Sequence, residues 1–256
     1  MIKTAVVTGF GINADYELQT AFEMAGAKAP LIHIKDLIHS PQRIKDFQII
    51  AFPGGFSFGD HIGSGKVFGS LFKLKLKDVL QEHVEAGKLV IGICNGFQVL
   101  VKMGILPNLE NDWKQEVSLV HNDSGVFEDR WVRASFNSKC QSPWISGLTE
   151  MDLPVRHGEG KFVVGSDAIA RALEEKNMIA LQYMNADGSS PVEYPANPNG
   201  SYKNIAGICD PTGRVLGLMP HPEAFIQREN HPLWQRRDIK SGEGLAFFEK
   251  GVSFFK

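Results

Sequence analysis

The 256-residue sequence has few cysteines, little net charge and no long hydrophobic run. Its three cysteines, Cys94, Cys140 and Cys209, include no CxxC pair, so neither a disulfide framework nor a zinc site is indicated. The formal net charge of −2 gives no support for binding to nucleic acid or to an anionic membrane surface. Because the apolar run at the N-terminus is too short for a signal peptide or a membrane span, we expect a cytoplasmic protein.

What is present is an ordinary soluble composition, with 43% hydrophobic residues, enough for one well-buried α/β domain over 1–256. Up to about residue 105, apolar runs typical of buried strands alternate with helical periodicity. This alternation predicts a parallel sheet with helices on both faces. The expected strands are 3–8, 31–34, 47–52 and 89–93, and the expected helices begin at a cap on Asn13 and around 76–87.

Beyond residue 106 the pattern changes to antiparallel strands. We expect these strands to form a small antiparallel extension of a flavodoxin-like sheet. They are followed by a long surface loop over 184–202, which contains three prolines and two glycines. The expected elements are strands 117–121, 131–136, 154–164 and 179–183, a helix over 167–176, a hairpin of 205–209 with 215–219, and a helix over 244–254.

The most informative stretch places Cys94 between the strand 89–93 and a helix that starts near Phe97. Gly92 and Gly96 stand two positions to either side, which suits a tight turn whose central residue has a strained, positive φ. Such a turn presents one nucleophilic atom at the end of a strand, and the first N–H groups of the helix favour a thiolate there. The sequence therefore predicts a nucleophile elbow that carries sulfur. The alternative is a buried structural cysteine in a glycine-rich turn.

A partner for this thiol is found in the stretch Pro220-His221-Pro222-Glu223. At the end of an extended strand, side chains at i and i+2 point to the same face, so His221 and Glu223 can reach one site. A carboxylate beside an imidazole sets its tautomer and stabilises the imidazolium. The order Cys…His-x-Glu is thus a candidate catalytic triad, although HPE alone would suit a surface turn equally well.

Acyl transfer also needs N–H donors for the oxyanion that develops on the substrate. The elbow offers the N–H of Asn95, and the Gly54-Gly55 pair of the glycine-rich stretch 53–60 offers a second, since a glycine backbone can approach a ligand closely. A plain tight turn is the alternative for this pair.

Two other glycine-rich patterns suggest nucleotide binding. Gly9-x-Gly11-x-x-Ala14 matches a dinucleotide fingerprint and would indicate a nicotinamide-dependent oxidoreductase, but Asp15 and Glu17 would oppose a pyrophosphate there. The stretch 63–67 differs from a P-loop, because it lacks the first glycine and the Ser or Thr that holds Mg²⁺. We therefore expect no cofactor and no metal site in this chain.

The segments PGGFSFGD (53–60), GICNGFQ (92–98), HGEG (157–160) and PHPE (220–223) resemble the class I, triad-type glutamine amidotransferases. Among these, they are most similar to the glutaminase subunits of phosphoribosylformylglycinamidine synthase (the PurQ type). The resemblance extends over nearly the whole chain and implies the flavodoxin-like sheet of that class.

The resemblance implies a triad of Cys94, His221 and Glu223, oxyanion donors at Gly55 and Asn95, and a glutamine contact from Gln98. It also implies that His157 and Glu159 lie near the substrate.

The implied reaction is hydrolysis of glutamine through a cysteine thioester. Ammonia would pass to a synthetase subunit (PurL type) that carries ATP and Mg²⁺, with a small accessory subunit (PurS type). A free-standing cysteine hydrolase or deglycase of the PfpI/DJ-1 type remains an alternative, but its histidine would normally follow the cysteine directly, where Asn95 stands.

Overall fold

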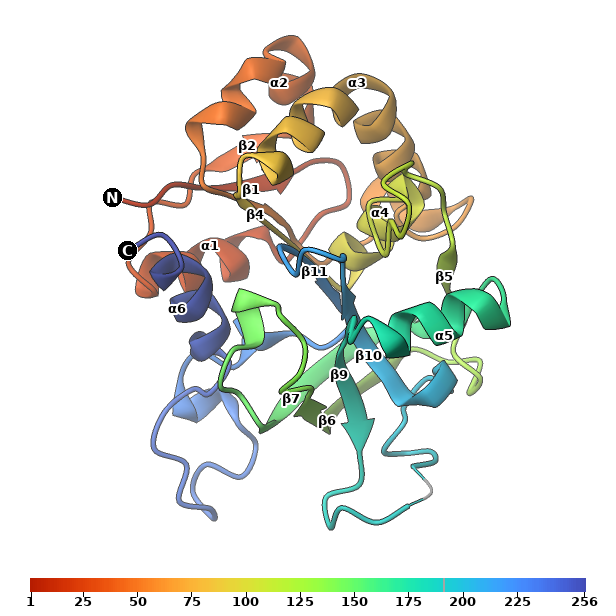
Figure 1. Ribbon diagram of the computed structural model, residues 1–256. Coiled ribbons are helices and arrows are strands. Elements are labelled where there is room, and N and C mark those ends of the chain that lie inside the picture. Colours follow the sequence, from red (N-terminus) through yellow and green to blue (C-terminus); the bar gives the residue numbers. More distant parts are fainter. Residues whose placement is uncertain (191) are drawn as a thin grey trace.

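The computed structural model describes residues 1–190 and 192–256, and strands alternate with helices through its first hundred residues (Figure 1). The strands are β1 (Thr4–Thr8), β2 (Leu31–His33), β3 (Ile49–Phe52), β4 (Leu89–Ile93), β5 (Val117–Val120), β6 (Glu128–Phe136), β7 (Glu150–His157), β8 (Lys161–Val164), β9 (Ile179–Met184), β10 (Ile205–Cys209) and β11 (Val215–Leu218). The α-helices are α1 (Asp15–Met24), α2 (Ile34–His39), α3 (Lys66–Glu85), α4 (Asn95–Met103), α5 (Asp167–Glu175) and α6 (Leu245–Ser253).

In the described part of the chain, nine strands form one sheet in the order β2-β1-β3-β4-β11-β10-β9-β6-β7. The pairs from β2 to β11 are parallel, and the pairs from β11 to β7 are antiparallel. The predicted α/β class with a parallel core is confirmed. The antiparallel part is larger than expected. The β10–β11 hairpin lies beside β4 through β11, and β9, β6 and β7 then add to the free edge of β10 in turn. A separate two-stranded sheet joins β5 to β8.

Helices cover both faces of the parallel strands (Figure 1). Strand β4 is buried along its whole length. On one face α1 packs against α6, with the rings of Phe22 and Phe248 5.0 Å apart. On the other face α3 and α4 pack together, and Phe72 of α3 lies 5.1 Å from Phe52 of β3. Burial on both faces explains why these strands are continuous apolar runs in the sequence.

Four sequence expectations need correction. Residues 154–164 are not one strand, because Gly158 to Gly160 form a turn that separates β7 from β8; a Cβ on Gly160 would lie 2.4 Å from the His157 ring. The helix expected from 76 begins at Lys66, and the short helix α2, which directly follows β2, was not predicted. Finally, α1 is capped at Ala14 without a side-chain hydrogen bond, so Asn13 is not the cap.

The long segment between β9 and β10 is irregular, as predicted, in residues 185–190 and 192–201. Residue 191, which falls within the predicted 184–202 loop, lies outside the described residues.

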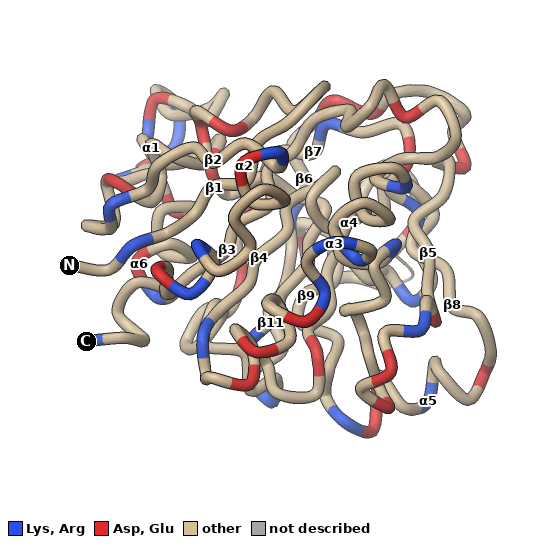
Figure 2. Tube along the Cα trace, turned by 90° about the horizontal axis from the view of Figure 1, so that it is seen from above, with Lys and Arg blue, Asp and Glu red and all other residues tan. Residues whose placement is uncertain are grey.

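Lys and Arg positions are interspersed with Asp and Glu positions along the whole chain (Figure 2), in keeping with the small net charge. None of the helices within residues 1–190 and 192–256 combines the length and the apolar character that a membrane-spanning helix needs.

Candidate active site

Cys94 stands at the turn from β4 into α4 with φ 52° and ψ −107°, so the predicted strained elbow is confirmed. A non-glycine residue in such a region costs roughly 1–3 kcal/mol and persists only where its surroundings enforce it. Here the enforcement is close packing: a Cβ on Gly96 would lie 1.9 Å from the carbonyl oxygen of Phe52, and one on Gly92 would lie 2.6 Å from that of Gly96.

The sheet order brings His221 to the same edge as Cys94. Strand β11 lies directly beside β4, and the N–H of Cys94 donates to the carbonyl oxygen of Leu218 at 2.8 Å. Three residues later the N–H of His221 donates to Pro154 of β7 at 2.8 Å, which fixes the chain after β11 against the antiparallel half of the sheet. The ends of β4, β11 and β7 therefore converge at one place.

Cys94 and His221 line a common cavity of about 250 Å³ together with Gly55. This volume lies below the roughly 300–1,000 Å³ of pockets for drug-sized ligands, and it suits a smaller metabolite. The other residues that line the cavity are Asn13, Ala14, Glu17, Phe56, Phe127 and Arg156.

His221 and Glu223 form a buried pair in which Nδ1 of the imidazole lies 2.5 Å from Oε1 of the carboxylate. The expected contact is present, but the backbone is not the extended strand end that was predicted. His221 caps a 3₁₀ turn over Pro222–Ala224, and this turn swings the carboxylate back toward the ring. A Cβ on Gly54 would lie 2.8 Å from Cε1 of His221, so the glycine pair packs directly against the imidazole.

Charge at the site favours a protonated His221. Burial by itself would lower the pKa of His221, but the Glu223 carboxylate and the Cys94 thiolate together raise it to about 10. At neutral pH the imidazole of His221 is therefore protonated. This is the charge state needed to protonate a leaving amine.

Two backbone N–H groups are available to an oxyanion. In residues 1–190 and 192–256 the N–H of Gly55 has no hydrogen-bond acceptor, and that of Asn95 is among the unpaired donors at the start of α4. Gly55 has φ 150°, and a Cβ there would lie 2.7 Å from the carbonyl oxygen of Gly11, so only glycine fits. The geometry agrees with the predicted oxyanion role, which itself stays a prediction.

Gln98 is buried and does not line the cavity. Its Nε2 donates to the carbonyl oxygen of Glu159 at 2.5 Å, and its Oε1 accepts from the Asn95 side chain at 2.8 Å. In this arrangement Gln98 positions the loop of Glu159 against the elbow. The predicted contact between Gln98 and glutamine is not part of this geometry and stays a prediction.

His157 is buried near the triad but does not line the cavity. Its Nδ1 lies 3.1 Å from Oδ1 of Asn122, whose side-chain amide also binds the backbone of His157 and of Gly160. Burial and the nearby positive charge of His221 lower the pKa of His157 to about 3, so this ring is neutral. Glu159 does not line the cavity either, and its Oε2 accepts from the N–H of Ser64 at 3.3 Å. Substrate contacts of His157 and Glu159 therefore also stay predictions.

The cavity contains two charged residues that the sequence reasoning did not assign to the site, Glu17 and Arg156. Arg156 immediately precedes the HGEG segment, and the carbonyl oxygen of Arg156 lies 3.6 Å from Sγ of Cys94. The position next to a motif was a usable signal for Arg156. No local sequence pattern links Glu17 to the active site.

The two nucleotide-like patterns have structural roles instead. Phe56 donates its N–H to Gly11 at 2.7 Å and Ala14 donates to Gly54 at 3.2 Å, so the Gly9–Ala14 loop supports the Gly54-Gly55 loop. In the second pattern, the Ser64 hydroxyl donates to Asp60 at 3.0 Å. Among the residues that the structure describes, no cluster of His, Cys, Asp or Glu is arranged to hold a metal ion.

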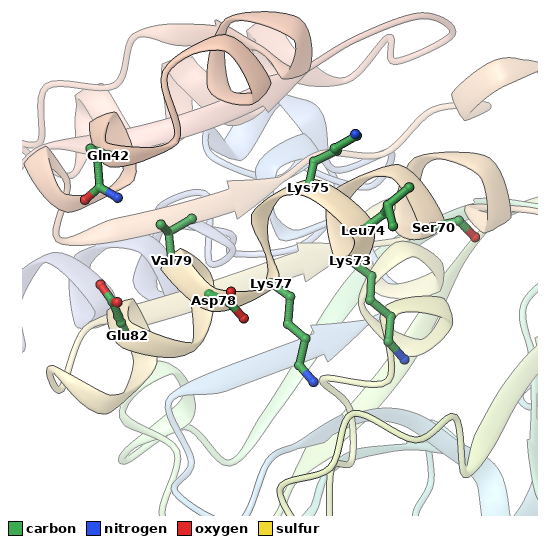
Figure 3. Close-up of a pocket in the computed structure, with 9 residues that line it drawn as sticks. All are labelled: Gln42, Ser70, Lys73, Leu74, Lys75, Lys77, Asp78, Val79 and Glu82. Atoms are coloured by element: carbon green, nitrogen blue, oxygen red, sulfur yellow. The ribbon is translucent and has the colours of Figure 1, made fainter.

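A larger cavity, of about 720 Å³, runs along the outer side of α3 (Figure 3). Lys73 and Lys77 point to one side of the helix and Lys75 to the other, while Asp78 and Glu82 supply acidic groups. Its lining residues include no cysteine and none with a positive φ, unlike the cavity at Cys94.

Comparison with known proteins agrees with the site. The model of the CobB/CobQ-like glutamine amidotransferase domain matches residues 1–255, and the chain belongs to this family. It is an amidotransferase with the α/β fold of its class.

More particularly, the chain is 42% identical over 254 residues to phosphoribosylformylglycinamidine synthase subunit PurQ of Dehalococcoides mccartyi, covering 99% of this chain and 97% of the relative. It is 40% identical over 272 residues to the PurQ subunit of Archaeoglobus fulgidus, covering 100% and 97%. Among solved structures, it superposes on a chain of PurLQS from Thermotoga maritima with a TM-score of 0.74 and 26% identity, covering 100% and 99%.

Proposed function

We propose that this chain is the glutaminase subunit of phosphoribosylformylglycinamidine synthase, which hydrolyses glutamine and delivers ammonia for purine biosynthesis. The observation that carries the proposal is Cys94, at φ 52°, sharing a small cavity with the buried His221–Glu223 pair. The relatives named PurQ, about 40% identical over nearly the whole chain, support this assignment within the family.

The reaction begins with attack of the Cys94 thiolate on the side-chain amide carbon of glutamine. The amide oxygen becomes an oxyanion, which the N–H groups of Gly55 and Asn95 stabilise. His221, as its imidazolium, gives a proton to the departing ammonia, and a γ-glutamyl thioester remains on Cys94. His221, now neutral, removes a proton from the attacking water, and glutamate leaves as the thiolate reforms.

Ammonia then passes to a partner. One structural neighbour is a chain of PurLQS from Thermotoga maritima, which supports a synthetase subunit of the PurL type and a small subunit of the PurS type as partners. We place ATP and Mg²⁺ on the synthetase, and the whole reaction in the cytoplasm. Docking would order the loops of Phe56 and Glu159 around the substrate, so the chain alone should hydrolyse glutamine slowly.

Cys94→Ala, mixed with the synthetase partner, tests the proposal. The variant should lose amidine formation with glutamine and retain it with ammonium salts at alkaline pH, because only ammonia supply is removed. The assay measures the amidine product for wild type and variant with both nitrogen donors. Equal loss with both donors would show that the chain does more than deliver ammonia, and full glutaminase turnover without a partner would favour an independent hydrolase.

The two alternative functions are not favoured. A pyrophosphate would need the N–H groups at the end of the Gly9–Ala14 loop, but those of Asn13 and Ala14 already donate to the carbonyl oxygen of Gly54, at 3.4 and 3.2 Å. A hydrolase of the PfpI/DJ-1 type is not favoured because the near-full-length relatives are PurQ subunits.

A further inference from the structure

Two opposite charges face each other inside the cavity that holds Cys94. Glu17 comes from the first turn of α1 and Arg156 from the end of β7, and Nη2 of Arg156 lies 3.1 Å from Oε2 of Glu17. The two side chains are 45% and 35% exposed, and 139 positions of sequence separate them. The triad chemistry described above uses neither residue.

Stability gives little reason for this ion pair. Half-exposed pairs contribute little, because water screens the attraction and ordering two long side chains costs entropy. Each residue of such a pair can therefore readily exchange the other residue for a ligand group of opposite charge. Its position inside a cavity, rather than on an open surface, points to that use.

The pair also stands at a suitable place relative to the nucleophile. Sγ of Cys94 lies 3.6 Å from the carbonyl oxygen of Arg156, so the arginine is anchored directly beside the reacting atom. In free glutamine three bonds separate the amide carbon from Cα, which carries one ammonium and one carboxylate. Both charges must therefore lie a short side chain's length from Cys94. Across the cavity, the rings of Phe56 and Phe127, with centroids 6.2 Å apart, offer an apolar surface to the methylene groups.

Given the proposed function, we infer that Glu17 and Arg156 are the specificity-determining residues for the amino-acid end of glutamine. Glu17 binds the α-ammonium, and the Arg156 guanidinium binds the α-carboxylate, a pairing that suits the planar fork of arginine. The internal ion pair closes the empty cavity and opens when the substrate offers both opposite charges. Glutamine within a peptide has neither charge, so the same pair excludes protein side chains from Cys94.

Ligand binding to the full chain with Cys94→Ala, which cannot form the thioester, tests this inference. Calorimetry would compare glutamine with Nα-acetylglutamine, which lacks the ammonium, and with glutamine α-amide, which lacks the carboxylate. Adding Glu17→Gln should weaken glutamine binding about 10- to 100-fold, as for loss of a charged hydrogen bond, without weakening Nα-acetylglutamine. Arg156→Met should do the same for glutamine while sparing the α-amide.

Matched controls are Glu23→Gln on the same helix and Arg171→Met on α5, both exposed and outside the cavity, which should leave all three affinities unchanged. Equal weakening of all three ligands by a cavity variant, no weakening, or no glutamine binding by the Cys94→Ala chain would overturn the inference. Intact mass of the wild-type chain after incubation with glutamine tests the proposed function separately. A thioester on Cys94 with unchanged ligand preferences would defeat only the inference, whereas its absence would defeat the proposed function.

Discussion

At the scale of single residues, two nearby histidines of the site differ in charge: His221 is protonated and His157 is neutral. The carboxylate of Glu223 and the thiolate of Cys94 more than offset burial at His221 and raise its pKa to about 10. Burial and the charge of His221 lower the pKa of His157 to about 3. Environments that push the pKa values of neighbouring groups apart assign them different tasks. Here the proton donor is His221, and neutral His157 holds the loop that follows β7.

This difference predicts the outcome of three alanine variants. His221→Ala should abolish glutaminase activity and Glu223→Ala should leave more residual activity, since the carboxylate orients and does not react. His157→Ala should still form the thioester. Mass spectrometry of the chain after incubation with glutamine measures this, and a thioester in His221→Ala but not in His157→Ala would reverse our choice of histidine.

The charge state of His221 can be measured directly. In the wild type its pKa, followed by the Cε1–H resonance during a pH titration, should lie well above the usual 6.5 and near 10. Because the pKa is raised on folding, the imidazolium contributes stability that is complete below about pH 6.5 and is lost as the pH rises toward 10. Cys94→Ala and Glu223→Gln should each lower this pKa, since each removes one of the two negative charges. An unchanged value in both variants would contradict the ion-pair description of the resting site.

At the scale of elements, the β4–α4 turn depends more on the absence of a Cβ at Gly96 than on the helix propensity of the residue there. Alanine is the better helix former by roughly 0.5–1 kcal/mol, so propensity alone favours Gly96→Ala within α4. The structure predicts the opposite, because the new Cβ would meet the backbone of Phe52 at 1.9 Å.

We compare Gly96→Ala with Gly87→Ala, where φ is 78° and nothing lies within 4 Å of the added atom. Gly87→Ala should cost about 1–2 kcal/mol from backbone strain alone. Gly96→Ala should cost more in urea unfolding and should also lower thioester formation, since the elbow must shift. A smaller loss at Gly96 than at Gly87 would mean that the turn can relax.

At the scale of the whole molecule, stability should fall on the acid side of neutrality. Burial lowers the pKa of His83, a buried residue of α3, to about 4 and that of His157 to about 3. The unfolded chain takes up these protons below about pH 6.5 and the folded chain does not, so acid favours unfolding. Each histidine should remove roughly 1.4 kcal/mol per pH unit below that point. His221 is already protonated there and adds no slope.

Urea unfolding at pH 7.5 and pH 5.0 measures this loss. His83→Gln should reduce the difference between the two pH values, whereas His61→Gln, at an exposed position, should leave it unchanged. An equal pH difference in the wild type and in His83→Gln would show that other groups control acid unfolding.

The sequence by itself determined the features that local geometry controls. Gly92 and Gly96 around Cys94 favour a tight, strained turn. His221 and Glu223 are only two positions apart, so their side chains can meet in an extended strand end as well as in the observed 3₁₀ turn. The alternation of apolar runs and helical periodicity likewise determined the parallel half of the sheet.

Only the tertiary structure decided what depends on distant segments. Whether 154–164 forms one strand or two depends on β6 and β5, which pair with its two halves. The ion pair of Glu17 with Arg156 spans 139 positions, and no local pattern can encode such a contact. The burial of Gln98 and the charge of His221 are also set by the groups packed around them. A short-range pattern restricts backbone angles, whereas burial, charge and the contents of a cavity follow from which surfaces the folded chain brings together.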